Sequence, residues 1–266
     1  MKIACLGSGK MGTALLKGFV AQGLCAPHDI TISDSSPAAR AAALAAIPGI
    51  LEAPDNLAAA LSADVVLLCV KPAGIVPLIQ SLHQVPPKLL ISIAAGITLN
   101  AMEAAAAHHR VIRVMPNTPA LIGKGASAFS PGRLASPDDC STASSLLNAV
   151  GSVTQVPEPL LDAVTGLSGS GPAYVYTIIE ALADGGVCEG LSKEQALTLA
   201  AQTLAGAAEM VLQSGLHPAV LRDQVTSPGG TTIHGLAALE SGGLRAALIS
   251  GVRAASLRAR ELGRPS

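Results

Sequence analysis

Aromatic side chains are almost missing from this 266-residue sequence, which contains no Trp and only two Tyr and two Phe. Proteins that bind single-stranded nucleic acid rely on aromatic rings against which the bases stack. A basic stripe, the electrostatic signature of a nucleic-acid-binding surface, is also missing, and the formal net charge is -1. The composition therefore argues against nucleic acid and against an anionic membrane surface as partners.

The sequence also lacks long apolar runs and paired cysteines. No apolar run reaches the roughly 18 residues that a membrane-spanning helix needs, and residues 1–6 read as a strand from the start, which leaves no room for a signal peptide. The five cysteines are scattered without a CxxC pair, so they indicate neither a disulfide framework nor a zinc site. We expect a soluble cytoplasmic protein that holds no metal and contacts no membrane.

Half of the sequence is apolar and only 13% is charged, which is enough to build a large core. In the first half, short β-rich runs alternate with alanine-rich helical stretches, the pattern of a parallel sheet with helical crossovers. The predicted strands are residues 2–6, 30–33, 65–70, 89–93, 111–115 and 152–156. The predicted helices are residues 11–22, 37–44, 56–61, 74–82 and 99–108.

The pattern changes after Pro157, because residues 160–263 show only helical segments broken by glycine turns. We therefore expect an α/β fold with a Rossmann-type NAD(P)-binding domain over residues 1–157 and an all-helical substrate and dimerisation domain over residues 158–266. Residues 174–187 and 193–212 are apolar on nearly every face, and such helices must be buried. A small helical domain cannot cover them alone, so we expect at least a homodimer.

The first glycine motif, GSGKMG at residues 7–12, follows an apolar run and opens a helical segment. In a dinucleotide-binding turn the first glycine makes a sharp bend, the second lets the backbone approach the pyrophosphate, and the third packs the helix against the strand. These glycines are Gly7, Gly9 and Gly12 here. A glycine turn alone is a weak signal, but the strand before it and the helix after it favour a dinucleotide over a structural turn.

Residues after the second strand bear on the choice between NAD and NADP. An acidic residue at this place commonly binds the ribose hydroxyls of NAD, and Asp34 occupies it. Its neighbours instead offer the hydroxyl groups and the guanidinium that a 2′-phosphate requires: Ser33, Ser35, Ser36 and Arg40. Asp34 then has another explanation, as the cap of the following helix. We expect NADPH to be preferred, with NADH as an alternative.

Three further loops follow predicted strands at the edge where parallel sheets bind ligands. Their sequences are CVKP at residues 69–72, SIAAG at residues 92–96 and MPNTP at residues 115–119. All three are short, small or fixed by proline, so they suit contact with a nicotinamide. Lys71 has two interpretations, as a solvated charge at a strand end or as a contact to substrate or cofactor.

A second glycine turn, Ser227-Pro228-Gly229-Gly230-Thr231-Thr232, opens a helical pattern over residues 233–239. Flexible glycines and the unpaired N–H groups of a helix N-terminus together form an anion site, here suited to a small acid. The alternative is a capping loop in which Thr is the N-cap. His234, just beyond the turn, is either a proton donor or a capping and packing residue.

Five segments together make the chain resemble the pyrroline-5-carboxylate reductases: GSGKMG, CVKP, MPNTP, TGLSGSGPAY at residues 165–174 and DQVTSPGGTTIHGL at residues 223–236. These enzymes use NAD(P)H in the last step of proline synthesis. The resemblance extends from residue 2 to about residue 262. It implies a Rossmann domain and a helical domain that interlocks with a partner subunit, in a homodimer or a larger ring of dimers.

The resemblance also implies the residues of both sites. The residues implied to bind substrate are Glu158, Ser227, Gly229, Gly230, Thr231 and Thr232. The residues implied to act in catalysis are Thr232, which orients the ring nitrogen, and Lys71. The residues expected to bind the cofactor are Leu6, Gly7, Ser8, Gly9, Lys10, Met11, Gly12, Ser33, Asp34, Ser35, Arg40, Asn56, Cys69, Val70, Lys71, Pro72, Ala94, Ala95 and Asn117. Two departures from the family pattern are Gln224, in place of Asn, and Asp34, which bears on the NADP preference.

Two other functions stay open from the sequence alone. A β-hydroxyacid dehydrogenase of similar build needs a general base, for which Lys193 is the candidate, although a solvated charge fits its place better. A non-catalytic NADP-binding redox sensor needs an exposed face for its partner, and no segment stands out as one. Imine reduction needs only a hydride donor, a fixed carboxylate and a protonated ring nitrogen.

Overall fold

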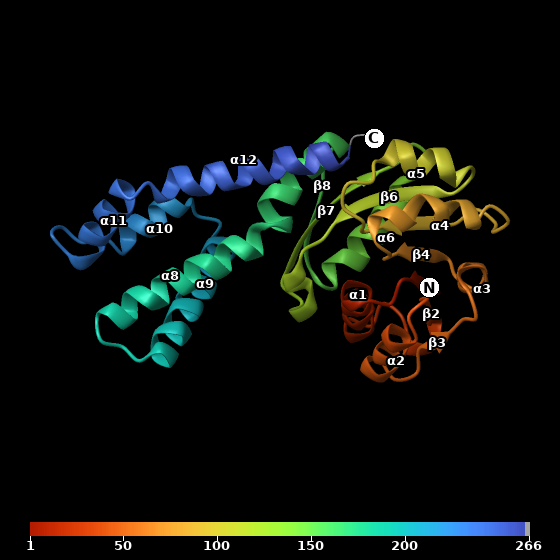
Figure 1. The fold of residues 1–266 in the computed structure, drawn as a ribbon, viewed down its shortest axis with the longest axis horizontal. Coiled ribbons are helices and arrows are strands. Elements are labelled where there is room, and N and C mark those ends of the chain that lie inside the picture. The colour runs from red at the N-terminus through yellow and green to blue at the C-terminus, as the bar shows by residue number, and fades with distance from the viewer. Residues whose placement is uncertain (264–266) are drawn as a thin grey trace. The chain divides into compact units, whose positions relative to one another are not determined.

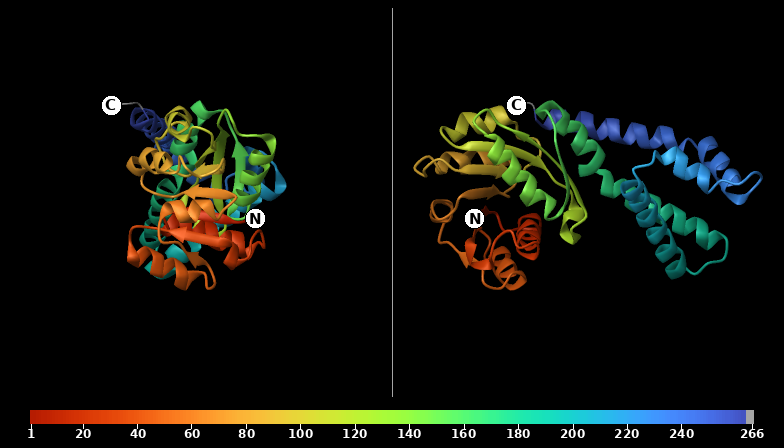
Figure 2. Two further views of the ribbon diagram at one scale, coloured as in Figure 1. Left: turned by 90° about the vertical axis from the view of Figure 1, so that its right-hand side faces the viewer. Right: turned by 180° about the vertical axis from the view of Figure 1, so that it is seen from behind.

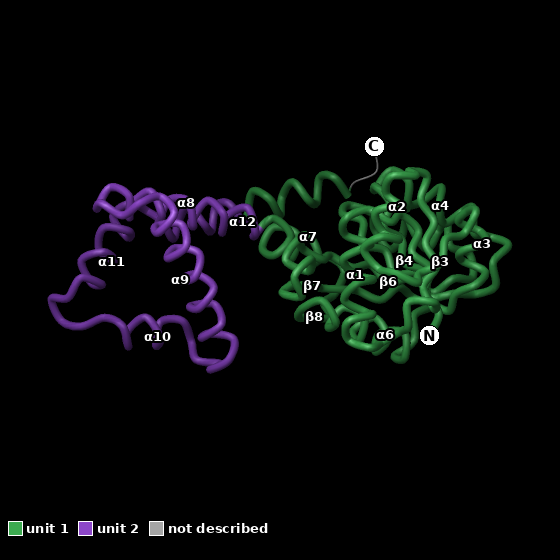
Figure 3. Tube along the Cα trace, turned by 90° about the horizontal axis from the view of Figure 1, so that it is seen from below, with its two compact units in different colours: residues 1–170, 253–266 green, residues 171–252 purple. Residues whose placement is uncertain are grey.

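The structure, a computed structural model, describes residues 1–263. The chain forms two compact units, which Figure 3 draws in different colours. Unit 1 comprises residues 1–170 and the segment from residue 253 onward, and unit 2 comprises residues 171–252. The segment 158–170 therefore packs with the sheet-containing unit.

Unit 1 is built around an eight-stranded sheet with the order β3-β2-β1-β4-β5-β6-β7-β8 (Figure 1). Its strands are β1 (Ile3–Leu6), β2 (Ile30–Ser33), β3 (Leu51–Glu52), β4 (Val65–Leu68), β5 (Leu89–Ser92), β6 (Arg110–Met115), β7 (Gly125–Pro131) and β8 (Gly151–Gln155). The six predicted strands are confirmed, with ends that shift by one or two residues. The order places β1 between β2 and β4, so the loops after all three strands lie at one edge.

The sheet is parallel from β3 through β6, as predicted for a Rossmann-type domain, but at its other side β7 pairs antiparallel with β6 and β8 runs parallel to β7. The chain reverses after β6 through the short 3-10 turn η3 (Thr118–Ile122), and a connection this short joins antiparallel neighbours. Two strands, β3 and β7, were not predicted at all. β7 reads GASAFSP, which is poor in β-branched residues, and β3 is only two residues long.

Helices cover both faces of the sheet (Figures 1 and 2). On one face lie α1 (Lys10–Ala21), α2 (Pro37–Ala46) and α6 (Pro137–Asn148), and on the other α3 (Asn56–Leu61), α4 (Ile75–Ser81) and α5 (Leu99–Ala106). Strand side chains alternate between the two cores, so Ile3 and Cys5 face one and Ala4 and Leu6 the other. Continuous apolar strands are the consequence of this double coverage.

Unit 2 contains helices and, among its residues, no strand, as the sequence predicted. Its helices are α8 (Gly171–Cys188), α9 (Lys193–Ser214), α10 (Pro218–Gln224), α11 (Thr231–Ser241) and the first part of α12 (Leu244–Leu262). Its buried apolar cluster is small and consists of Ala183, Ala196 and Ala200, with Ile179 packed against it. At Gly186 an added Cβ would lie 3.2 Å from the Cβ of Ala196, so a small residue there permits the close approach of α8 and α9.

Many large apolar side chains of unit 2 stay exposed on the single chain. Leu199, Met210 and Leu212 on α9 are more than half exposed. Tyr176 on α8 and Val225 after α10 are exposed to a similar degree. Among the helices of residues 1–263, none is long and apolar enough to cross a membrane.

Candidate functional site

A pocket of about 780 Å³ lies in unit 1, at the ends of β1, β2, β4, β5 and β6. Such a volume is typical of ligand sites, and the carboxyl edge of a parallel sheet is where dinucleotides bind. The lining residues are Gly7, Gly9, Lys10, Met11, Gly12, Asp34, Ser35, Cys69, Val70, Lys71, Pro72, Ile93, Ala94, Ala95, Met115, Pro116, Asn117, Thr118, Leu121 and Gly169. The loops after five strands thus meet in one hollow.

The glycine turn after β1 has the backbone geometry that its motif predicts. Gly7 has φ +100°, and a Cβ there would lie 2.7 Å from the carbonyl carbon of Cys69. A Cβ on Gly12 would lie 2.6 Å from the Gly7 carbonyl oxygen, so only glycine permits this packing. Gly9 borders open space and is the N-cap of α1, without a side-chain cap. The first N–H groups of α1 are therefore available to an anion.

Asp34 does not cap α2, which corrects one of the two sequence interpretations. The N-cap is Ser36, whose hydroxyl accepts from the N–H of Ala39. The Asp34 carboxylate instead accepts from the N–H of Ser8 at 2.7 Å and from the N–H of Ser36 at 2.8 Å. Asp34 therefore fastens the end of β2 to the glycine turn, while it also lines the pocket.

Arg40 lies beside Asp34 and is held by two acceptors. Its Nη1 donates to the Asp34 carbonyl oxygen at 2.6 Å and its Nε to the Glu52 carboxylate at 2.5 Å. Glu52 belongs to β3 and was not anticipated, because the pairing of this short edge strand with β2 is set by tertiary contacts. Of the predicted cofactor residues, those outside the pocket lining are Leu6, Ser8, Ser33, Arg40 and Asn56.

Lys71 and the neighbouring loops come together in the pocket as predicted from their positions after the strands. Lys71 is exposed and is followed directly by the 3-10 turn η2 (Pro72–Gly74). Asn117 is buried, and its side chain accepts from the N–H of Ala126 at 2.8 Å and donates to the Ser168 carbonyl at 3.0 Å. Asn117 thus fixes β7 and the π-helical turn η5 (Thr165–Gly169) to the pocket wall.

Glu158 takes part in an ion pair that the sequence did not reveal. Its Oε1 lies 2.9 Å from Nη1 of Arg113 and accepts the N–H of Leu99 at 2.6 Å. Arg113 is buried on β6, and Leu99 is the first residue of α5. Glu158 therefore joins the start of α5 to β6, in addition to any contact with substrate. The partners are distant in sequence, so no local pattern signals them.

Two thiols lie behind the glycine turn, where a Cβ added to Gly12 would lie 3.0 Å from Sγ of Cys5 and 3.3 Å from Cβ of Cys69. A hydrogen bond with Cys5, together with burial, raises the pKa of the Cys69 thiol well above its usual value. A protonated thiol is a poor nucleophile, so this cysteine lines the pocket as an uncharged group. Within residues 1–263, no group of three His, Cys, Asp or Glu side chains is placed to hold a metal ion.

The second glycine turn lies in unit 2 and leads into α11. Gly229 has φ +67°, and Gly230, not a threonine, is the N-cap of the helix, without a side-chain cap. The N–H of Gly230 already donates to the Ser227 carbonyl at 3.1 Å. The first N–H groups of α11, from Thr231 and Thr232, have no acceptor within the helix. A Cβ on Gly230 would lie 2.3 Å from the Ser227 hydroxyl, so a larger residue there would require the Ser227 side chain to move.

His234 is tied to the same turn. Its Nδ1 lies 2.9 Å from the Gly230 carbonyl oxygen, and since a carbonyl only accepts, Nδ1 carries the proton. This contact supports the capping interpretation of His234 over that of a proton donor.

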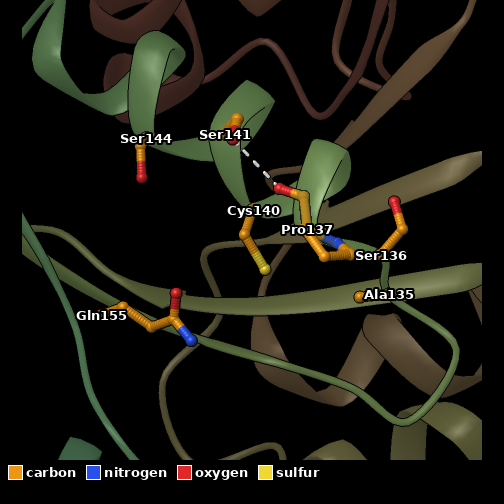
Figure 4. A pocket seen from close by; sticks show the side chains of 7 residues that line it. All are labelled: Ala135, Ser136, Pro137, Cys140, Ser141, Ser144 and Gln155. Atoms are coloured by element: carbon orange, nitrogen blue, oxygen red, sulfur yellow. Dashed lines mark hydrogen bonds between the residues drawn. The ribbon is translucent and has the colours of Figure 1, made fainter.

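A second hollow lies on unit 1 between the start of α6 and β8 (Figure 4). Its lining includes Cys140, Ser144 and Gln155, and the Ser141 hydroxyl donates to the Pro137 carbonyl at 3.0 Å. Burial and the nearby Asp139 raise the pKa of the Cys140 thiol. The side chains there lack the convergent charges of a reactive site.

Comparisons with known proteins agree on one family. Residues 158–262 match the family model for pyrroline-5-carboxylate reductase dimerisation, and residues 2–96 match the model described as NADP oxidoreductase coenzyme F420-dependent. A pyrroline-5-carboxylate reductase of Methanosarcina acetivorans is 46% identical, covering 99% of this chain and 98% of the relative. The enzyme of Pisum sativum is 45% identical over 97% of this chain and 94% of its own.

Solved structures give the same result. A pyrroline-5-carboxylate reductase from Coxiella burnetii superposes with a TM-score of 0.94 at 36% identity, covering 99% of both chains. The Plasmodium falciparum enzyme, solved with NADP bound, has a TM-score of 0.87 at 30% identity, covering 99% of this chain and 98% of its own. With relatives above 40% identity over nearly the whole sequence, the chain belongs to the pyrroline-5-carboxylate reductase family.

Proposed function

We propose that this chain reduces 1-pyrroline-5-carboxylate to L-proline with NADPH, the last step of proline biosynthesis. The observation that carries the proposal is the 46% identity to a pyrroline-5-carboxylate reductase over 99% of the chain. Each of the glycine turns, at residues 7–12 and 227–232, contains a glycine with the positive φ that favours glycine, Gly7 in the first and Gly229 in the second. The chain thus retains an anion-binding turn in each half.

The pocket in unit 1 is the proposed cofactor site. It offers the glycine turn and the N-terminus of α1 for the pyrophosphate, and the region of Ser35 and Arg40 for the adenosine ribose. The related Plasmodium falciparum enzyme was solved with NADP, which supports NADPH here, with NADH as an alternative. When bound, the nicotinamide supplies the hydride.

The second turn is the proposed substrate site. The N–H groups of Thr231 and Thr232 would bind the carboxylate, and the Thr232 hydroxyl would orient the ring nitrogen. Lys71 and Glu158 are proposed as further contacts to the reacting groups. The ring nitrogen enters as a protonated iminium and the hydride adds to the adjacent carbon, so the chain needs to position the substrate rather than supply a nucleophile.

We further propose a homodimer in which residues 158–266 form the subunit interface. Residues 1–157 would form a separate Rossmann domain. The dimerisation model that matches residues 158–262 supports it. The exposed apolar side chains of unit 2, among them Leu199 and Leu212, support it too, because a single chain leaves them in water. A cytoplasmic location stays a prediction of the sequence.

Turnover of pyrroline-5-carboxylate by the purified chain is the test. NADPH oxidation, followed by absorbance, should depend on added substrate and yield proline in equal amount. A chain that binds NADPH but forms no proline would contradict the proposal and favour the redox sensor.

A β-hydroxyacid dehydrogenase would instead reduce NADP with a hydroxy acid. Its candidate base, Lys193, is exposed and paired with Asp184. The hydrogen bond that Lys193 donates to the Asp184 carboxylate raises the pKa of Lys193, whereas a general base works best with a pKa near the operating pH. We expect no turnover of hydroxy acids.

A further inference from the structure

The ion pair between Arg40 and Glu52 has no role in the proposed reaction. Their side chains are 27% and 40% exposed, so the pair lies at the surface beside the end of β2. Glu52 is brought there by the pairing of β3 with β2, in which Ile32 lies opposite Glu52. The contact therefore depends on an edge strand of two residues.

This ion pair borders the place where the two nicotinamide cofactors differ. In a parallel dinucleotide-binding sheet, the residue after the second strand faces the adenosine ribose. Asp34 and Ser35 line the pocket at that position, and Arg40 donates to the carbonyl oxygen of Asp34. A 2′-phosphate on the ribose would therefore approach the Arg40 guanidinium, and a 2′-hydroxyl would not need it.

The charges around Arg40 are unbalanced. The single guanidinium of Arg40 is accompanied by two carboxylates, those of Asp34 and Glu52. Backbone N–H groups of Ser8 and Ser36 bind the Asp34 carboxylate, whereas the Glu52 carboxylate binds Arg40 itself. A phosphate dianion must compete with the Glu52 carboxylate for Arg40. Once bound there, it would also lie close to the negative charge of Glu52.

We propose that Glu52 is a specificity-determining residue, which weakens binding of the 2′-phosphate by occupying Arg40 and so narrows the preference for NADPH over NADH. The proposal rests on the proposed function as a nicotinamide-dependent reductase. Glu52 acts through Arg40 and not by contact with the reacting atoms.

The test measures binding of two fragments that differ only in the phosphate, 2′,5′-ADP and 5′-AMP, by titration calorimetry. Glu52→Gln removes the charge and keeps the shape of an exposed side chain. We expect 2′,5′-ADP to bind roughly three- to tenfold more tightly, because the variant removes one negative charge near the 2′-phosphate dianion and salt screens part of that repulsion. Binding of 5′-AMP should not change.

Two further variants make the result specific. In an Arg40→Gln background, Glu52→Gln should change 2′,5′-ADP binding by no more than about twofold, because the competing partner is gone. Asp138→Asn removes an exposed carboxylate on α6, outside the pocket lining, and should leave both affinities unchanged.

Three results would overturn the proposal: no gain in 2′,5′-ADP affinity, an equal gain without Arg40, or a matching change in 5′-AMP affinity. The ratio of kcat/KM for NADPH to that for NADH should rise by the same factor as the affinity, through KM. Neither fragment reacts, so the binding result stands even if the chain does not turn over pyrroline-5-carboxylate. Loss of turnover alone counts against the proposed function.

Discussion

Thr232 lies at the second position of α11, where its N–H and its hydroxyl share one helix N-terminus. Thr232→Val keeps the shape and removes the hydroxyl. A lost hydrogen bond to a charged group costs about 1.5–3 kcal/mol, so kcat/KM for pyrroline-5-carboxylate should fall roughly ten- to a hundredfold. Steady-state kinetics measure this loss.

Thr231→Val is the matched control, since the proposed role of Thr231 uses its backbone N–H only. It should lose much less activity than Thr232→Val. NADPH affinity should stay unchanged in both, because the pocket proposed for the cofactor lies in unit 1. A Thr232→Val variant with wild-type turnover would show that the ring nitrogen finds its partner elsewhere.

We expect His109 to make the free energy of unfolding depend on pH. It is buried, its Nδ1 accepts the N–H of Lys88 at 3.1 Å, and its Nε2 lies 3.2 Å from the Leu82 carbonyl. Burial lowers the pKa of His109, so the unfolded chain binds a proton more readily than the folded one. The free energy of unfolding should therefore fall as the pH drops below about 6.5, until the pH passes the folded-state pKa.

Urea unfolding between pH 5 and 8 measures this effect. His109→Asn removes the titration and should flatten that part of the profile, while His83→Asn, at an exposed site, should leave it unchanged. A wild-type profile that is flat over this range would contradict the prediction.

At the scale of elements, Arg113 joins β6 to the segment before α7 (Leu161–Val164). Its guanidinium is buried against Glu158, and Nη2 lies 4.0 Å from Asp162. Arg113→Met would leave both carboxylates without their cation. Breaking a buried pair costs about 3–5 kcal/mol, and the partial exposure of Glu158 reduces the expected loss to about 2–3 kcal/mol. Thermal and urea unfolding measure it.

Glu158→Gln separates packing from substrate binding. Glutamine still offers an oxygen to the N–H of Leu99, so the stability loss should be smaller than in Arg113→Met. If Glu158 also contacts the substrate, the KM for pyrroline-5-carboxylate rises in Glu158→Gln even though the fold is retained. An unchanged KM would restrict Glu158 to its structural role.

At the scale of the whole molecule, assembly and stability are linked. Unit 2 buries only a small alanine cluster and exposes large apolar side chains. We expect no folded monomer, so dilution should lower the melting temperature, and light scattering should detect at least a dimer at micromolar concentration. A folded monomer that persists at nanomolar concentration would contradict this expectation. Leu199→Glu, on the exposed face of α9, should weaken assembly.

Local sequence signals were sufficient for six strands, for the helical second half and for both glycine turns. Each of these depends on neighbours in the chain: apolar runs, alanine-rich stretches, or glycines at fixed spacing. Most of the pocket lining was also predictable, because the ends of parallel strands meet at one edge. Leu121 and Gly169 were missed, since η3 and η5 carry no strand-end signal.

The sequence by itself thus determined the change from an alternating α/β pattern to helices, the direction of most of the sheet and the two glycine turns, since short-range periodicity and glycine spacing encode them. Tertiary structure alone decided the reversal at β7, the ion pair of Glu158 with Arg113 and the contact of Glu52 with Arg40. These features join residues that are distant in the chain. These contacts are stabilised by strand register and by burial of their side chains, and both arise only when the strands have paired.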